Sequence, residues 1–168
     1  MTDADFRDAF HRHKDIVYRF AYRMTGSSST AEDVVQDCFV AFWQKPQAYD
    51  PSRGALRAFL LGVARNLILK RWRNERLHKS LDDAMEGESG FSLAFDIEGQ
   101  ERAEAVKRAI LLLPPLQREA VILAEHEELT LQEIAQATAA ELAAVKSRLH
   151  RARQNLRRML QPLFAIER

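Results

Sequence analysis

The sequence predicts an all-α protein made of two small helical domains joined by a flexible acidic linker. The chain has only 6 Gly in 168 residues and is rich in Ala, Leu, Arg and Glu, which favours helices over sheets. Its apolar residues recur at helical steps of three and four along most of its length. Its charge falls into three blocks, with a net +4 over residues 1–73, −6 over 74–104 and +3 over 105–168.

The first basic block begins with two expected helices. Apolar residues over positions 6–24, with His13 in one slot, form a helical stripe that Gly26 ends as a C-terminal cap. The spacing Ser29-x-x-Glu32 is that of a capping box, so a second helix is expected to start there. Pro46 cannot continue a helix, so this second helix should stop near position 45.

A loop and a third helix follow. Residues 46–54 hold two Pro and one Gly without periodicity, which predicts a loop between two strong helices and a candidate functional loop. Apolar residues at helical spacing then predict a third helix from about Ala55 to Arg73. Residues 76–104 carry most of the acidic excess and three Gly, so they are the expected linker between domains at 1–75 and 105–168.

The second domain is expected to contain a helix-turn-helix. Pro114 and Pro115 divide its first helical stripe, and Pro115 suits the first turn of a new helix. Thr130-x-x-Glu133 is a second capping box, and a short break at 137–141 precedes a long apolar stripe over 142–163. A short helix, a tight turn and a long helix are typical of this motif.

A run of basic side chains lines the last expected helix. Residues 146–158 contain six Lys or Arg and no acid. On a helical wheel, the residues beside the apolar stripe are Lys146, His150, Arg153 and Arg157, and those pointing away from it are Ser147 and Arg151. Such a surface offers donors to phosphates and to base edges in a major groove. A solvated basic helix face is the alternative interpretation.

Two further surface patterns lie in the first domain. Residues 64–73 form a second basic patch that includes Trp72, whose ring could stack on an unpaired base. Because a helix C-terminus attracts Lys and Arg through its dipole, a purely structural interpretation stays open. Asp33, Gln36 and Asp37 form an acidic-polar stripe away from the apolar face of the second helix. This stripe is either a solvated face or a protein-binding face.

Other chemistries find little support. The Gly residues form no dinucleotide fingerprint or phosphate loop, and the sequence has no nucleophile elbow and no His-Glu-x-x-His motif. His11 and His13 splay apart on a helix, and Cys38 sits in an apolar stripe as a small core residue. We therefore expect no enzyme activity, cofactor or metal. No apolar run approaches the roughly 20 residues of a membrane span, and no signal-peptide core is present, so a cytoplasmic location is expected.

Four segments of the chain resemble motifs of a known family. They are Ala31 to Phe39, Phe59 to Asn66, Leu129 to Ala135 and Val145 to Arg153. In this order they resemble the extracytoplasmic-function (ECF) group of bacterial RNA polymerase sigma factors, in the sigma-70 superfamily. The resemblance implies that the two domains are sigma domains two and four. Their expected function is to bind core RNA polymerase, direct it to specific promoters and help melt the minus-ten element.

The resemblance also implies a role for each group of residues. Core polymerase, through its largest-subunit clamp helices and its flap, would be the partner of Asp33, Gln36 and Asp37. Minus-ten DNA would be bound by Lys45, Arg53, Arg65, Asn66, Lys70, Arg71, Trp72 and Arg73. Minus-thirty-five DNA would be bound by Thr130, Gln132, Lys146, Ser147, Arg148, His150, Arg151 and Arg153. The acidic linker would thread the polymerase channel otherwise used by RNA.

Regulation is expected from a further partner. The resemblance implies a separate anti-sigma protein, often membrane-tethered, which would hold the chain at the inner membrane, and it implies no small-molecule substrate. A free-standing helix-turn-helix regulator that binds operator DNA is the main alternative, but it leaves the stripe of Asp33, Gln36 and Asp37 without a role. An enzyme or a structural helical adaptor has no supporting motif.

The sequence departs from the family pattern at several positions. Thr138-Ala139 and Ala143-Ala144 stand where Leu-Gly and Gly-Thr are usual. A left-handed turn residue is unfavourable without Gly, so the turn could be rearranged. Thr30 and Lys70 stand where Asp is common, and Lys70 makes the minus-ten helix more basic.

Overall fold

Three long helices form the first domain of the computed structural model, which describes residues 1–81 and 100–164. Helix α1 (Asp3–Thr25) starts at a capping box between Thr2 and Asp5. It ends at Gly26, whose φ of 69° lies in the left-handed region, as the sequence predicted. Helices α2 (Ser28–Gln44) and α3 (Leu56–Leu81) follow, separated by a single 3₁₀ turn (Pro46–Ala48) and a loop.

The ends of α2 and α3 differ from the sequence-based expectation. Ser27, not Ser29, caps α2: its hydroxyl accepts a hydrogen bond from the Thr30 amide at 3.2 Å. The chain is already extended at Ser27, directly after the left-handed Gly26, so the first available hydroxyl begins the helix. Helix α3 continues to Leu81, and neither Pro nor Gly occurs between positions 73 and 81 to end it earlier. The part of the expected linker over 82–99 lies outside the described residues.

Within residues 100–164, the second domain contains four α-helices and one π-helical segment. They are α4 (Gln100–Leu112), α5 (Pro115–Val121), the π-helical segment Ile122–His126, α6 (Leu131–Thr138) and α7 (Leu142–Phe164). Pro115 occupies the first turn of α5, as expected. The π-helical segment was not predicted, since periodicity does not distinguish one wide turn from an α-helical one.

The turn between α6 and α7 keeps its left-handed geometry without Gly. Thr130 caps α6 by accepting a hydrogen bond from the Glu133 amide at 3.1 Å. Ala139 ends the helix with φ 50° and ψ 42°, and the Ala140 amide donates to the Ala135 carbonyl at 3.0 Å. The rearranged turn that the missing Gly suggested is therefore not found. Instead, Ala139 tolerates a conformation that is unfavourable for a non-Gly residue by about 1–2 kcal/mol.

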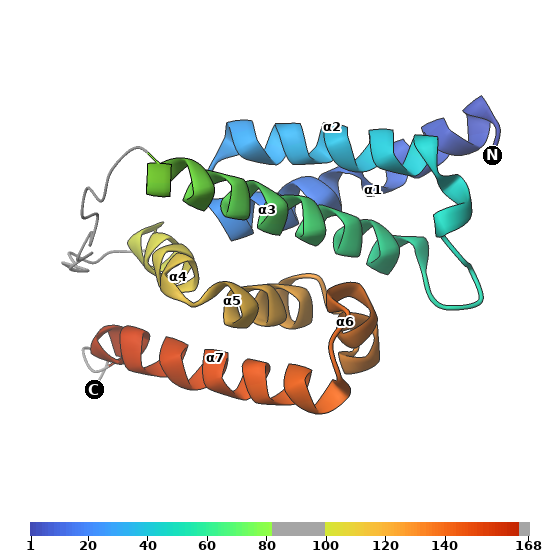
Figure 1. Cartoon of the computed structure of the whole chain (residues 1–168). Coiled ribbons are helices and arrows are strands. Elements are labelled where there is room, and N and C mark those ends of the chain that lie inside the picture. Colours follow the sequence, from blue (N-terminus) through green and yellow to red (C-terminus); the bar gives the residue numbers. More distant parts are fainter. Residues whose placement is uncertain (82–99, 165–168) are drawn as a thin grey trace.

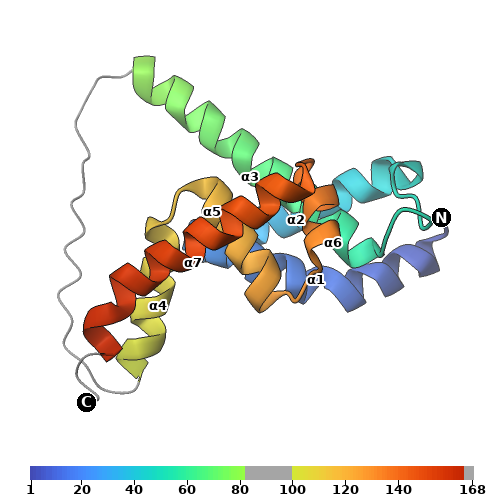
Figure 2. The ribbon, with the colours of Figure 1, turned by 90° about the horizontal axis from the view of Figure 1, so that it is seen from below.

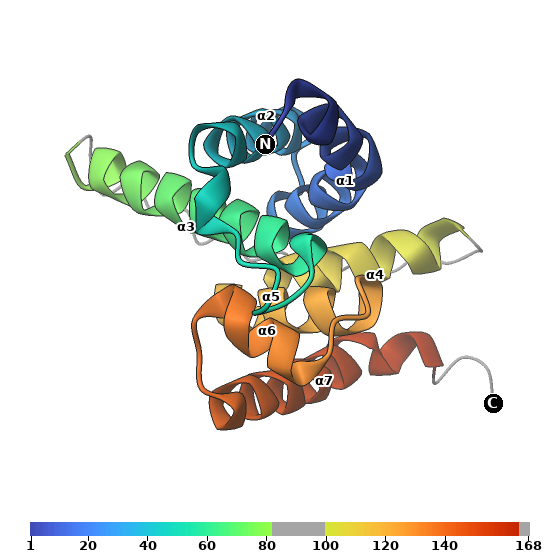
Figure 3. The ribbon, with the colours of Figure 1, turned by 90° about the vertical axis from the view of Figure 1, so that its right-hand side faces the viewer.

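The two domains pack against each other. Helices α1 to α3 lie on one side of the molecule and α4 to α7 on the other (Figure 1). Seen from the side, α3 lies between the α1–α2 pair and the α6–α7 pair, and α3 contacts α6 directly (Figure 3). The last turns of α3 project past the other helices (Figure 2). None of the described helices is long and apolar enough to cross a membrane.

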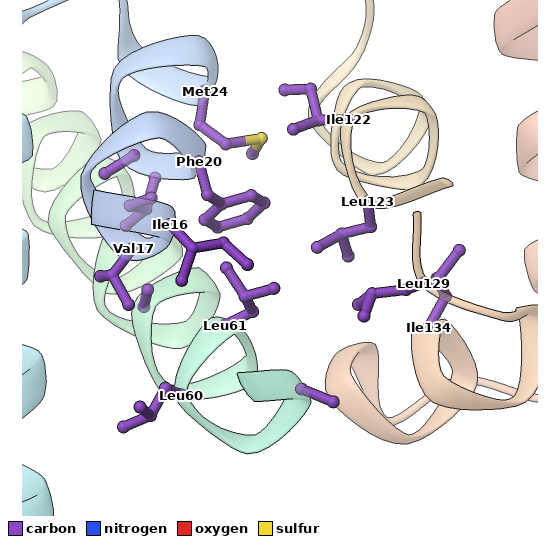
Figure 4. Packing of buried hydrophobic residues seen from close by; sticks show 14 of the residues in the cluster. Ile16, Val17, Phe20, Met24, Leu60, Leu61, Ile122, Leu123, Leu129 and Ile134 are labelled. Atoms are coloured by element: carbon purple, nitrogen blue, oxygen red, sulfur yellow. The ribbon is translucent and has the colours of Figure 1, made fainter. Parts of the chain in front are cut away.

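One apolar core spans both domains. Phe20, Met24 and Leu61 from the first domain are completely buried and belong to the same cluster as Ile122 and Leu123 from the second. Figure 4 shows these side chains from α1 and α3 pointing toward those of the π-helical segment. The all-α, two-domain prediction is confirmed, and the shared core is a feature that the sequence did not indicate.

Candidate polymerase and nucleic-acid surfaces

The acidic-polar stripe of α2 is exposed but not isolated. The side chains of Asp33 and Asp37 are 62% and 51% exposed. Arg71 of α3 pairs with both: its Nη2 lies 2.9 Å from Asp37 Oδ2, and its Nη1 lies 3.9 Å from Asp33 Oδ2. Arg71 was assigned to minus-ten DNA, and the structure places it against the carboxylates assigned to the polymerase. One arginine therefore connects the two expected surfaces of the first domain.

Two apolar residues extend this stripe and were missed by the sequence-based assignment. Val40 and Trp43 are 47% and 45% exposed, and they follow Gln36 at helical spacings of four and seven. The Trp43 ring packs edge-on against Phe6, with centroids 5.0 Å apart. Large exposed apolar groups beside polar ones are typical of protein-binding surfaces. The helical spacing from Gln36 was the signal that could have identified them.

The loop after α2 forms one wall of a pocket. The Tyr49 hydroxyl donates to the Gly54 carbonyl at 3.2 Å, and Asp50 accepts two hydrogen bonds from Ser52. These bonds from Ser52 hold the pKa of Asp50 below its ordinary value. The pocket, of about 380 Å³, lies between this loop, α3 and α6, and its lining includes Tyr49, Arg53, Phe59, Asn66 and Gln136. Two of the predicted minus-ten residues, Arg53 and Asn66, therefore meet at one cavity.

The other predicted minus-ten residues have different surroundings. Arg65 is largely buried and binds Glu119 of α5 through two hydrogen bonds, from Nε to Oε2 at 2.8 Å and from Nη2 to Oε1 at 3.1 Å. The guanidinium of Arg118 lies 5.4 Å from the centroid of the Trp72 ring. Lys45, Lys70 and Arg73 are exposed. Two groups that would meet DNA thus contact the second domain instead.

Helix α7 presents basic residues on the side opposite its buried stripe. Val145, Leu149 and Ala152 are at most 5% exposed. The predicted minus-thirty-five residues that are exposed are Thr130, Gln132, Lys146, Ser147, His150, Arg151 and Arg153, and Arg148 is half-buried. Arg153 is hydrogen-bonded to Glu125 of the π-helical segment. This geometry suits a helix that packs with one face and binds a polyanion with the other.

Comparisons with known proteins agree with this architecture. Residues 9–78 match the family model for sigma-70 region 2, and residues 103–156 match that for sigma-70 region 4. The chain is 29% identical to ECF RNA polymerase sigma factor SigW of Bacillus subtilis, over 94% of this chain and 90% of SigW. It is 30% identical to ECF RNA polymerase sigma factor RpoE of Cereibacter sphaeroides, over 92% of this chain and 86% of that protein.

The fold also occurs in a solved structure. The sigma factor RpoE of Bartonella quintana, crystallised with the anti-sigma factor NepR, has a TM-score of 0.73 and 24% sequence identity to this chain. The match covers 94% of this chain and 97% of that one. The region 2 and region 4 matches, the two helical domains and the identity to curated relatives lead to one conclusion. The chain belongs to the family of ECF RNA polymerase sigma factors.

Proposed function

We propose that the two domains of this sigma factor have different binding roles. The protein is a transcription initiation factor that directs RNA polymerase to promoters, and it is neither an enzyme nor a free-standing regulator. Residues 1–75 bind core polymerase and the minus-ten element. Residues 105–168 bind the minus-thirty-five element in duplex form. The observation that carries the proposal is the two-sided character of α7, which buries Val145 and Leu149 while exposing Lys146, His150 and Arg151.

The polymerase surface is the outer face of α2. Asp33, Gln36 and Asp37 supply charge and hydrogen-bonding groups, while Val40 and Trp43 supply apolar area that is exposed in the free chain. Protein interfaces combine an apolar centre with a polar rim, and this face contains both kinds of group. The paired Arg71 holds Asp37 at 2.9 Å and so orients one carboxylate for an incoming partner.

An anti-sigma protein is the proposed regulator. Support comes from the fold that this chain shares with the Bartonella quintana sigma factor, which was solved with the anti-sigma factor NepR. If that regulator is tethered to a membrane, it would hold the chain at the inner membrane. Pull-down from the source bacterium under non-inducing conditions tests this proposal. Recovery of free or polymerase-bound chain alone, with no stoichiometric third protein, would contradict it.

In vitro transcription with core RNA polymerase and a promoter library tests the assignment of DNA-binding residues. Arg148→Ala and Arg151→Ala should each weaken binding to the minus-thirty-five element by about 1–3 kcal/mol. Each should therefore lower transcription from promoters that need this element. The matched control is Lys107→Ala, which removes an exposed positive charge from α4. Normal output from both α7 variants would refute the assignment, and operator binding without polymerase would favour a free-standing regulator.

A further inference from the structure

A second buried carboxylate joins the domains beside the Arg65–Glu119 pair. Glu127, directly after the π-helical segment, is 4% exposed. Its Oε1 lies 3.3 Å from Arg23 Nη1, and its Oε2 lies 3.7 Å from Arg19 Nη2, both of α1. Burial raises the pKa of both Glu119 and Glu127, and the neighbouring arginines oppose this effect. A buried carboxylate is strongly unfavourable without such partners. We call these contacts of Glu119 and Glu127 the interdomain latch.

The two domains also approach each other closely at other positions. A Cβ atom placed on Gly62 of α3 would lie 3.0 Å from the Ala137 carbonyl oxygen of α6. Arg118 of α5 donates from Nη1 to the Met24 carbonyl at 2.5 Å, across the domain boundary. It also donates from Nη2 to the Leu111 carbonyl at 2.6 Å. A charged side chain therefore binds main-chain carbonyls, and a glycine lies directly against the neighbouring backbone. The two domains have little room to shift relative to each other.

The latch covers groups that the proposed function assigns to promoter DNA. Glu119 occupies the same guanidinium of Arg65 that would bind a phosphate, and a carboxylate offers this group the same bidentate geometry. Arg118 covers the Trp72 ring, and Gln136 and Ala137 of α6 close one side of the pocket that holds Asn66. At these positions the first domain can contact either the second domain or the minus-ten strand, but not both at once.

The spacing of promoter elements excludes this arrangement independently. Elements centred near positions minus ten and minus thirty-five are about 85 Å apart on B-DNA, at about 3.4 Å per base pair. Helix α3 has 26 residues and is therefore about 39 Å long, and it touches α6 of the helix-turn-helix. A molecule closed in this way cannot place its two DNA-binding surfaces on both elements at once.

We propose that the free chain inhibits itself. Glu119 and Glu127 of the second domain hold the first domain in a closed conformation that cannot engage a promoter. Glu119 acts as an internal substitute for a DNA phosphate at Arg65, and core polymerase binding must break the latch. This inference rests on the proposed function for its consequence, while the latch itself is a property of the free chain. No anti-sigma protein is needed for closure, since every group in the latch belongs to this chain.

Small-angle X-ray scattering of the free full-length chain tests the latch. The wild type should have a radius of gyration near the compact-chain value of about 15 Å. Each charged pair lost in Glu119→Gln/Glu127→Gln should raise the open-to-closed ratio by about tenfold or more, and the radius should increase. Arg23→Gln tests the same latch from α1, and Glu104→Gln, an exposed change on α4, is the matched control. Circular dichroism at 222 nm checks that every variant keeps its helices.

An extended wild type, or a double variant as compact as the control, would overturn the latch. Binding to core polymerase by fluorescence anisotropy then tests inhibition, because a closed fraction weakens apparent affinity in proportion. The double variant should bind core more tightly, by a factor equal to the inverse of the wild-type open fraction. Opening without tighter binding would overturn self-inhibition. If no variant binds polymerase, the proposed function and the inhibition both fail, while the scattering result still decides the latch.

Discussion

Gly62→Ala should have opposite effects on α3 and on the contact between the domains. In a solvent-facing helix interior, replacing Gly by Ala stabilises a protein by about 0.8–1.0 kcal/mol. Gly62 is buried, however, and a Cβ there would lie 3.0 Å from the Ala137 carbonyl oxygen and 3.3 Å from its Cα. These are backbone atoms of α6, held next to the left-handed Ala139, so they cannot rotate away.

The magnitude follows from these two opposing terms. Overpacking a close contact typically destabilises by about 1–3 kcal/mol, which exceeds the gain in helix propensity. We therefore expect Gly62→Ala to lower the free energy of unfolding of the full-length chain by up to about 2 kcal/mol. The change should also loosen the contact between α3 and α6, so the radius of gyration of the free chain should rise.

Urea unfolding followed by circular dichroism measures the first effect, and small-angle scattering measures the second. Asn74→Ala is the control, because Asn74 is an exposed residue of the same helix and gains helix propensity without adding a group at the domain contact. It should stabilise by a few tenths of a kcal/mol and leave the radius unchanged. If Gly62→Ala instead stabilises the chain by about 1 kcal/mol at constant radius of gyration, the backbone of α6 does not lie in close contact with Gly62 of α3.

Four other predictions follow from the Ala139 turn, the Cys38 thiol and the α2 carboxylates. Ala139→Gly should stabilise the chain by about 1 kcal/mol in urea unfolding, since Gly adopts the left-handed turn without strain, and unchanged stability would contradict this. Burial raises the pKa of the Cys38 thiol to about 12, so Ellman's reagent at pH 8 should label Cys38 only in urea. Because the unfolded thiol ionises near its ordinary pKa of 9.0, this group makes stability fall as pH rises from 9 toward 12. Asp33→Lys with Asp37→Lys should weaken binding to core polymerase by several kcal/mol, measured by anisotropy, with helix content retained. Unchanged affinity would refute the α2 assignment.

Local features of the fold followed from the sequence because local interactions determine them. Gly26, Pro115 and the Thr130 cap each act within one turn of a helix, so their positions were predicted correctly. The start of α2 was placed at Ser29 rather than at Ser27 because only Ser29 has a Glu three residues later, at capping-box spacing. The extended backbone directly after Gly26 makes Ser27 the cap instead.

The contact between domains could not be predicted, because it joins residues far apart in the chain. Arg65 and Glu119 are 54 positions apart, and each has an ordinary structural explanation on its own helix. Two signals were nevertheless present. Gly62 interrupts an otherwise strong helical stripe without ending it, and Glu119 directly precedes an apolar run from Ala120 to Leu123. A lone acid at the edge of a buried run requires a cationic partner, which the sequence could not name.

The chemical nature of the contact bears on how readily it can open. An apolar interface loses its whole stabilisation when it separates, because the exposed surface is returned to water. Glu119 and Arg65 regain hydration on separation, which offsets much of the free energy that their pairing contributes, whereas removing Glu119 alone leaves Arg65 without its partner in the closed state. Leu61, Ile122 and Leu123 then supply most of the attraction. In a closed state held in this way, the apolar core supplies attraction and the charged pairs fix the geometry. The arginine released on opening is the same group that we propose binds the promoter.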